Sequence, residues 1–150
     1  MRTITPICGL VLLAIPLLGG AQQEAAQALP RTPSPDGAMV YFLSPEDGAT
    51  VTSPVTVRFG LRGMGVAPAG VQAPNTGHHH LAIDVDALPP EGLPLPNDEH
   101  IRHFGGGQTE TELALPPGQH TLQLVFADAN HVQHQPPVRS EKITINVVAK

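Results

Sequence analysis

Beyond residue 37, apolar residues recur at every second position in short runs, and glycine and proline separate the runs. In residues 54–61, Val55, Val57, Phe59 and Leu61 share one side of an extended chain, which is typical of a half-buried β-strand. Similar or β-rich runs predict seven strands, at residues 39–43, 54–61, 78–85, 101–104, 109–115, 120–127 and 141–148. The pattern therefore predicts an all-β fold, an immunoglobulin-like antiparallel β-sandwich of about seven strands.

The first 37 residues show no strand pattern. Residues 1–21 have the parts of a signal peptide, because Arg2 makes the start positive, residues 7–18 are mostly apolar, and small residues precede a cleavage site after Ala21. The apolar run is too short for a stable membrane anchor, so we expect a periplasmic or secreted protein. Residues 22–37 mix Gln, Ala, Pro and Ser, and we interpret them as a flexible tether to a β-sandwich domain at residues 38–150.

Composition narrows the possible chemistry. The only cysteine, Cys8, lies in the predicted leader, so the mature chain lacks the thiolates that blue-copper, zinc-ribbon and iron–sulfur sites require. The formal charge of -5 becomes -6 when Arg2 is lost, with 7 basic against 13 acidic residues, which argues against nucleic acid or an anionic membrane as a partner. Aromatic residues make up 3% of the chain and tryptophan is absent, which disfavours a sugar-stacking platform.

Seven of the eight histidines gather in three clusters beside loops, at residues 78–80, 100–103 and 131–134. His78 and His80 are two apart on a predicted strand, so their imidazoles share one face, whereas His79 faces the core. If the strands follow one another up and down, the loops that carry the three clusters emerge at one end of the sandwich. Neutral imidazoles suit Cu(II), Zn(II) or Ni(II). The predicted metal ligands are His78, His80, His103, His131 and His134.

The other polar residues receive secondary roles or none. His79 and His100 are reserve ligands, and His120 falls at the opposite end of the predicted sandwich and is interpreted as structural. Acidic residues that could orient the ligand rings are Asp84, Asp98, Glu99 and Asp128. The glycines at 105–107 lack the lysine and helix start of a phosphate-binding loop, so they predict a turn. No catalytic residue is assigned, and any single histidine is also consistent with an ordinary surface or hydrogen-bonding role.

Four segments resemble one known family. They are Gly77–Leu81 (GHHHL), Asp98–Glu110 (DEHIRHFGGGQTE), Pro117–Leu124 (PGQHTLQL) and Asn130–Pro137 (NHVQHQPP). Over about residues 45–148 the chain closely resembles an exported bacterial family known as domain of unknown function 4399. The resemblance implies secretion and a single domain, and it implies that the histidines belong to the family pattern. It implies no activity.

The leading hypothesis is therefore an exported protein that binds copper, with zinc as the alternative metal, for periplasmic metal handling. A second hypothesis is a non-metal envelope module whose polar loops bind a protein or polysaccharide. A third is a metalloenzyme with an open copper position, which the sequence neither supports nor excludes.

Overall fold

The computed structural model describes residues 27–149. The predicted signal peptide and residues 22–26 of the predicted tether lie outside the described residues. The described part of the chain contains no helix, and so none long and apolar enough to cross a bilayer. Its ten strands are β1 (Met39–Ser44), β2 (Thr50–Thr52), β3 (Val55–Arg62), β4 (Gly65–Val66), β5 (Thr76–Ile83), β6 (Ile101–His103), β7 (Glu110–Leu113), β8 (Gly118–Ala127), β9 (Gln133–Arg139) and β10 (Ile143–Val148).

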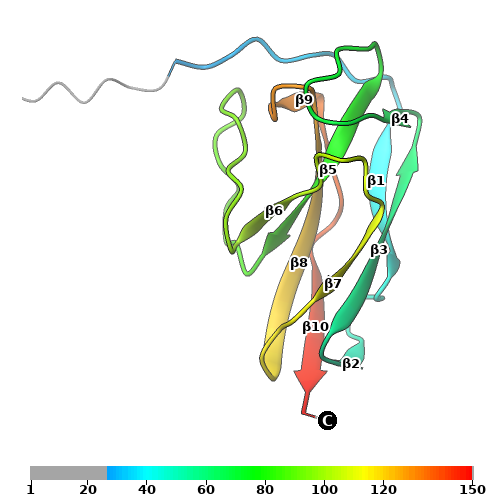
Figure 1. Ribbon diagram of the computed structural model, residues 1–150, viewed down its shortest axis with the longest axis vertical. Coiled ribbons are helices and arrows are strands. Elements are labelled where there is room, and N and C mark those ends of the chain that lie inside the picture. Colours follow the sequence, from blue (N-terminus) through cyan, green and yellow to red (C-terminus); the bar gives the residue numbers. More distant parts are fainter. Residues whose placement is uncertain (1–26, 150) are drawn as a thin grey trace, which may run out of the picture.

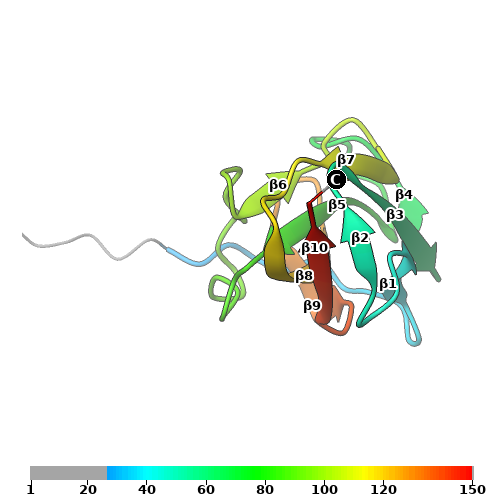
Figure 2. The ribbon, with the colours of Figure 1, turned by 90° about the horizontal axis from the view of Figure 1, so that it is seen from below.

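The strands form two packed sheets, so the predicted all-β sandwich is confirmed (Figure 1; Figure 2). The smaller sheet has the order β1-β3-β7, and the larger has the order β2-β10-β8-β5-β4, with β6 also paired to β5 and β9 to β8. All seven predicted strands are present. The prediction missed β2, β4 and β9, since the first two are very short and β9 contains two prolines. Two of the missed strands pair in parallel, β2 with β10 and β4 with β5.

The main core lies between the two sheets. The alternating residues of β3, among them Val57 and Phe59, pack against those of the larger sheet, among them Leu81, Leu124 and Phe126. Burying this apolar area is the principal stabilisation of such a sandwich, at about 25 cal/mol per Å².

A second, smaller apolar cluster lies on the outer face of the larger sheet. Leu95, from the loop between β5 and β6, packs with Ala82, Ile101, Val125 and Ala127. This loop, residues 84–100, therefore covers the face that strand alternation alone would leave to solvent. As a result, β5 is buried on both faces from Gly77 to Ile83, although its sequence is not a continuous apolar run.

Part of the predicted tether lies against the sandwich. The backbone of residues 32–34 exchanges hydrogen bonds with Gln135 in β9: Gln135 donates to Thr32 at 2.9 Å, and Ser34 donates to Gln135 at 3.1 Å. Arg31 adds a side-chain hydrogen bond of 3.0 Å from Nε to the carbonyl of Gln133. We call residues 28–35 the N-terminal strap. Figure 1 shows this segment in blue, running across the end of the sandwich near β9.

Candidate metal centre

The centre is built on β5, the strand of the larger sheet that pairs with β8, β4 and β6. His78 and His80 project from its outer face, and His80 lies directly opposite His103 in the antiparallel pairing of β5 with β6. Directly opposed residues place their side chains on the same face of the sheet. One ring nitrogen from each of His78, His80 and His103 can be chosen so that all three lie within 4.8 Å of one another. The predicted pairing of His78 with His80 therefore acquires a third imidazole from the neighbouring strand.

A fourth imidazole comes from the turn between β8 and β9. His131 Nε2 lies 3.1 Å from His103 Nε2, and the ring centroid of His131 is 5.0 Å from that of His78 and 5.9 Å from that of His80. We call these four residues the histidine cluster (His78, His80, His103 and His131). Three of the predicted ligand segments thus meet in one place.

Burial separates an inner pair from an outer pair in the cluster. His78 and His80 are each 0% exposed, whereas His103 and His131 are partly exposed. Both ring nitrogens of His78 and both of His80 are buried without a hydrogen-bond partner. A buried polar atom without a partner costs about 1–3 kcal/mol. The four nitrogens of these two neighbouring side chains are therefore available as ligands for a metal ion.

The same burial keeps the inner imidazoles neutral. Desolvation, followed by the positive charge that His103 and His131 would carry, lowers the pKa of His78 to about 4. Desolvation and the neighbouring histidines lower the pKa of His80 to about 2. Desolvation also lowers the pKa of His103. Because a metal ion binds only the unprotonated imidazole, these shifts leave the ligands ready to bind at neutral and mildly acidic pH.

The turn that presents His131 is organised by Asp128. Its carboxylate Oδ1 accepts the backbone N–H groups of Asn130 at 2.9 Å and Val132 at 3.0 Å. His131 itself has a φ of 66°, in the left-handed region that a residue with a Cβ rarely adopts. The hydrogen bonds of the turn therefore hold His131 in a conformation that it would otherwise leave.

His134 does not join the histidine cluster, so the structure separates one predicted ligand from the other four. Its ring stacks on Phe126, with centroids 6.0 Å apart, and its Nδ1 lies 2.8 Å from the hydroxyl of Thr32 in the strap. Phe126 belongs to the core between the sheets, whereas the cluster lies on the opposite face of β5. His134 is three positions beyond His131, past the turn, and extends to this other face.

The reserve ligands are also outside the cluster. His79 faces the core, where its ring lies 5.1 Å from Phe59 and 5.0 Å from Phe126, and burial lowers its pKa to about 4. His100 is 59% exposed, beside Glu99. His120 bonds Asp84 and the carbonyl of Pro116, in agreement with the structural interpretation.

The acidic residues expected to orient the ligand rings have other partners. Asp84 bonds His120, Asp98 accepts the backbone N–H groups of His100 and Ile101, and Asp128 organises its own turn. Glu99 is 85% exposed and lies 3.6 Å from His100. None of these four carboxylates has a hydrogen bond to a ring of the histidine cluster among the described residues. The cluster is therefore a donor set made of nitrogen alone.

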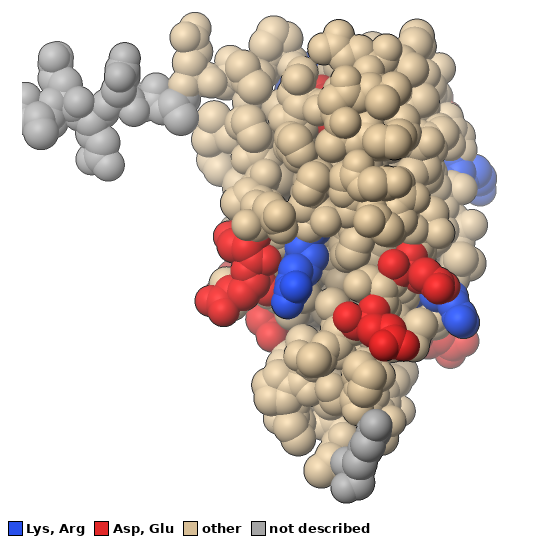
Figure 3. Space-filling model, in the orientation of Figure 1, with Lys and Arg blue, Asp and Glu red and all other residues tan. Residues whose placement is uncertain are grey.

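The surroundings of the cluster are almost free of charge. Residues 63–83, 103–109 and 129–138 contain no Lys, Arg, Asp or Glu. Figure 3 shows the charged side chains of one face gathered across its middle and the part above them nearly uncharged. Asp128 lies just before the last of these ranges, and its negative charge opposes the lowering of the His78 pKa by burial.

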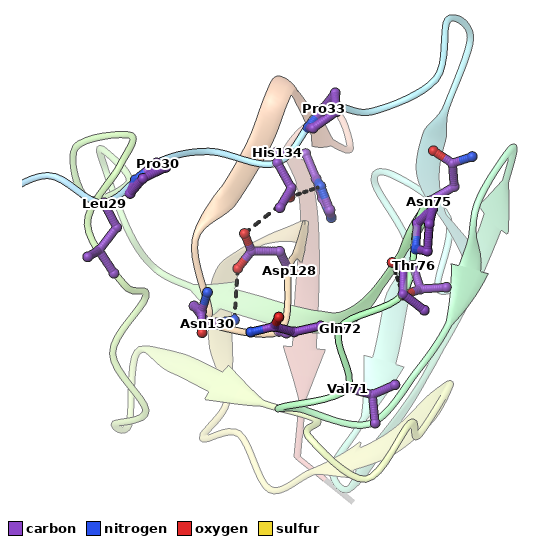
Figure 4. Close-up of a pocket in the computed structure, with 14 residues that line it drawn as sticks. Leu29, Pro30, Pro33, Val71, Gln72, Asn75, Thr76, Asp128, Asn130 and His134 are labelled. Atoms are coloured by element: carbon purple, nitrogen blue, oxygen red, sulfur yellow. Dashed lines mark hydrogen bonds between the residues drawn. The ribbon is translucent and has the colours of Figure 1, made fainter.

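A cavity of about 670 Å³ lies on the other side of the Asp128 turn. The N-terminal strap forms one wall through Leu29, Pro30 and Pro33, and residues 71–76 form another, while Asp128 and His134 line the interior (Figure 4). The cavity is largely apolar, and none of the four histidines of the cluster lines it. It is therefore distinct from the candidate metal centre.

A family model described as Domain of unknown function (DUF4399) matches residues 57–148. This chain belongs to that family. The matched region begins within β3, ends at the last residue of β10 and includes all four histidines of the cluster. The candidate metal centre of this DUF4399 protein thus lies wholly inside the family domain.

Other comparisons add little to the family assignment. No curated protein matches the sequence. Among solved structures, the DUF4399 protein is similar to an endo-β-1,4-mannanase from Thermotoga petrophila, with 18% sequence identity and a TM-score of 0.45. The match covers 75% of this chain and 20% of the mannanase chain, so the chain spans only a small part of the length of that enzyme. A likeness this distant carries no argument about function.

Proposed function

We propose that this protein is exported and binds copper through the histidine cluster, for metal handling in the periplasm and not for catalysis. The observation that carries the proposal is the set of buried, unpartnered ring nitrogens of His78 and His80, next to the imidazoles of His103 and His131. The sequence at residues 1–21, which has the features of a signal peptide, supports export.

The spacing of the nitrogens suits a transition metal. Metal–nitrogen bonds of about 2.0–2.1 Å place neighbouring ligands roughly 2.9 Å apart in the square-planar geometry of Cu(II) and roughly 3.3 Å apart in a tetrahedron. The 3.1 Å between His103 Nε2 and His131 Nε2 is close to these separations, and one ring nitrogen from each of His78, His80 and His103 lies within 4.8 Å of the other two. Hard cations such as Ca²⁺ and Mg²⁺ need oxygen ligands, which the cluster does not offer.

The donor set favours copper among the metals that bind imidazole. Affinity of a given nitrogen site rises to Cu(II) and falls again at Zn(II), so an uncharged site made of four imidazoles takes copper where both ions are present. Four imidazoles also fill a four-coordinate site, whereas a catalytic metal needs an open position. Both features support storage or transfer of the ion.

Burial disfavours the non-metal interaction module. A contact surface needs side chains that a partner can reach, and His78, His79 and His80 are all 0% exposed. The cost of burying the imidazoles of His78 and His80 without partners is understandable if an ion binds them, but a surface contact gives no reason for it.

Calorimetric titration of the purified, untagged protein with Cu(II) and with Zn(II) tests the proposal. Wild type should bind one ion, with Cu(II) tighter than Zn(II). His78→Ala/His80→Ala should abolish this binding, because even groups that only orient a ligand contribute about 10–100-fold to affinity. His100→Ala removes an exposed histidine outside the cluster and should bind like wild type. Unchanged binding in the double variant, with its fold verified by circular dichroism, would refute the site.

A further inference from the structure

The N-terminal strap contacts the turn that carries His131 by two separate routes. The first runs through Thr32, whose hydroxyl donates to Asp128 Oδ2 at 3.1 Å. The other oxygen of this carboxylate accepts the N–H groups of Asn130 and Val132, on either side of His131. One side chain of the strap therefore holds the carboxylate around which the turn is folded.

The second route runs through the loop of residues 84–100. In the strap, the backbone N–H of Leu29 donates to the carbonyl of Gly92 at 2.7 Å, and Arg31 Nη1 forms an ion pair with Glu91 Oε2 at 2.6 Å. From the same loop, the N–H of Leu95 donates to the carbonyl of His131 at 2.9 Å. The strap thus fixes the loop, and the loop fixes the backbone of His131.

These routes matter because His131 needs support. Its left-handed backbone conformation is costly for a residue with a Cβ, and it is the one member of the cluster that lies in a turn, outside the strands. His78, His80 and His103 are held by the hydrogen-bonding ladders of β5 and β6. Loss of the strap would therefore release the fourth imidazole and leave the other three in place.

We infer that the N-terminal strap is a positioning element for the proposed copper site, with Thr32 and Arg31 holding the His131 imidazole in the histidine cluster. The inference rests on the proposed function. Thr32 and Arg31 touch no ion, and they act through Asp128 and through the loop of residues 84–100. Coupling is reciprocal by thermodynamic necessity, so binding of the ion through His131 also holds the strap more tightly against the sandwich.

The first test compares Thr32→Val, which removes the hydroxyl, with Thr32→Ser, which restores it. The matched control is Ser34→Ala, because Ser34 lies in the same strap but its hydroxyl bonds the carbonyl of Pro136 and makes no hydrogen bond to the turn. Thr32→Val should lower Cu(II) affinity about tenfold, as loss of a group that orients a ligand does. Nitrogen hyperfine coupling in the electron paramagnetic resonance spectrum should fall from four imidazoles to three. Thr32→Ser and Ser34→Ala should match wild type.

The second test uses limited trypsin digestion to measure how readily the strap opens. Cleavage after Arg31, whose side chain is 15% exposed, requires the strap to open, whereas cleavage after Arg62 requires β3 to open. Cu(II) should slow cleavage after Arg31 at least severalfold relative to cleavage after Arg62. In His131→Asn, where Asn tolerates the left-handed conformation, Cu(II) should no longer slow it.

The outcomes separate the inference from the proposed function. If wild type binds no Cu(II), or if His78→Ala/His80→Ala binds like wild type, the proposed function is wrong and the inference falls with it. If wild type binds Cu(II) but Thr32→Val keeps four imidazoles with unchanged affinity, and Cu(II) leaves cleavage after Arg31 unaffected, the inference alone is overturned.

Discussion

Gly105 lies against the ring of His103 so closely that a Cβ at position 105 would be 2.3 Å from Cε1 and 2.5 Å from Nε2 of that imidazole. Real Cβ atoms do not approach other atoms this closely, so any other residue at this position would displace the ring. The sequence predicts a turn at the glycine run after β6. The run thus also leaves room for the imidazole of His103, one of the proposed metal ligands.

The first prediction follows from this contact. Gly105→Ala should lower Cu(II) affinity by at least about tenfold, because the His103 ring must leave the cluster, and isothermal titration measures the loss. Gly106→Ala is the matched control, since its added Cβ meets only the flexible end of the Gln108 side chain, at 2.9 Å. Equal affinities for the two alanine variants would contradict the steric argument.

A second prediction concerns His79, which is buried in the core with no hydrogen-bond partner for either ring nitrogen. His79→Leu should raise the free energy of unfolding by about 1–2 kcal/mol, because an apolar side chain removes the desolvation cost of the imidazole. Urea denaturation of the metal-free protein measures the change. Copper affinity should stay at the wild-type value, and a loss of binding would show that His79 is a ligand after all.

Acid should destabilise the metal-free protein. The pKa of His78 is lowered to about 4 and that of His80 to about 2, while both are near 6.5 in the unfolded chain. The unfolded state therefore binds more protons below pH 6.5, and stability falls as the pH drops toward 4, by up to about 1.4 kcal/mol per pH unit for each histidine. Denaturation at pH 7, 6 and 5 tests this expectation. The slope should be shallower in His78→Ala/His80→Ala, and equal slopes would count against neutral buried imidazoles.

His120 should show the opposite pH dependence. Its hydrogen bond to Asp84, 2.7 Å from Nδ1 to Oδ2, raises its pKa, and the carbonyl of Pro116 accepts from Nε2 at 2.9 Å. Because the pKa of His120 is higher in the folded than in the unfolded protein, its protonation stabilises the fold. This stabilisation is complete below the unfolded pKa of about 6.5 and is lost as the pH rises through the folded pKa. Wild type should therefore be more stable than His120→Gln at pH 6, by a margin that shrinks toward pH 9. A margin independent of pH would rule out this linkage.

Strand alternation in the sequence predicted the seven main strands and the shared face of His78 and His80. The expected convergence of the loops at one end of the sandwich led to His103, which lies opposite His80, and to His131, which lies in the turn between β8 and β9. The same reasoning failed at His134, because the distance of three positions from His131 and the intervening turn place the two rings on opposite faces of the sheet. Once the strand β9 is known, the place of His134 follows from alternation, because its neighbour Gln133 lies opposite Ala127 of the outer face.

Other features depended on contacts that no local pattern encodes. The sequence of residues 84–100 predicts only a proline-rich connecting loop, yet Leu95 packs this loop against the outer face of β5. The sequence of the strap predicts a tether. Its attachment consists of backbone hydrogen bonds to β9 and of side-chain contacts of Arg31 and Thr32 with residues far along the chain, among them Glu91, Asp128 and Gln133. Long-range contacts of this kind are set by the tertiary fold, and the composition of the segment does not reveal them.

The four imidazoles of the histidine cluster come from β5, β6 and the turn before β9, segments that are far apart in the chain. They meet only when the larger sheet has formed, so the complete site has no counterpart in the unfolded polypeptide. If the cluster binds an ion as proposed, folding must precede full coordination, and the ion is taken from the metals present where the chain folds. The compartment in which the protein reaches its native state would thus decide its metal as much as the ligands do.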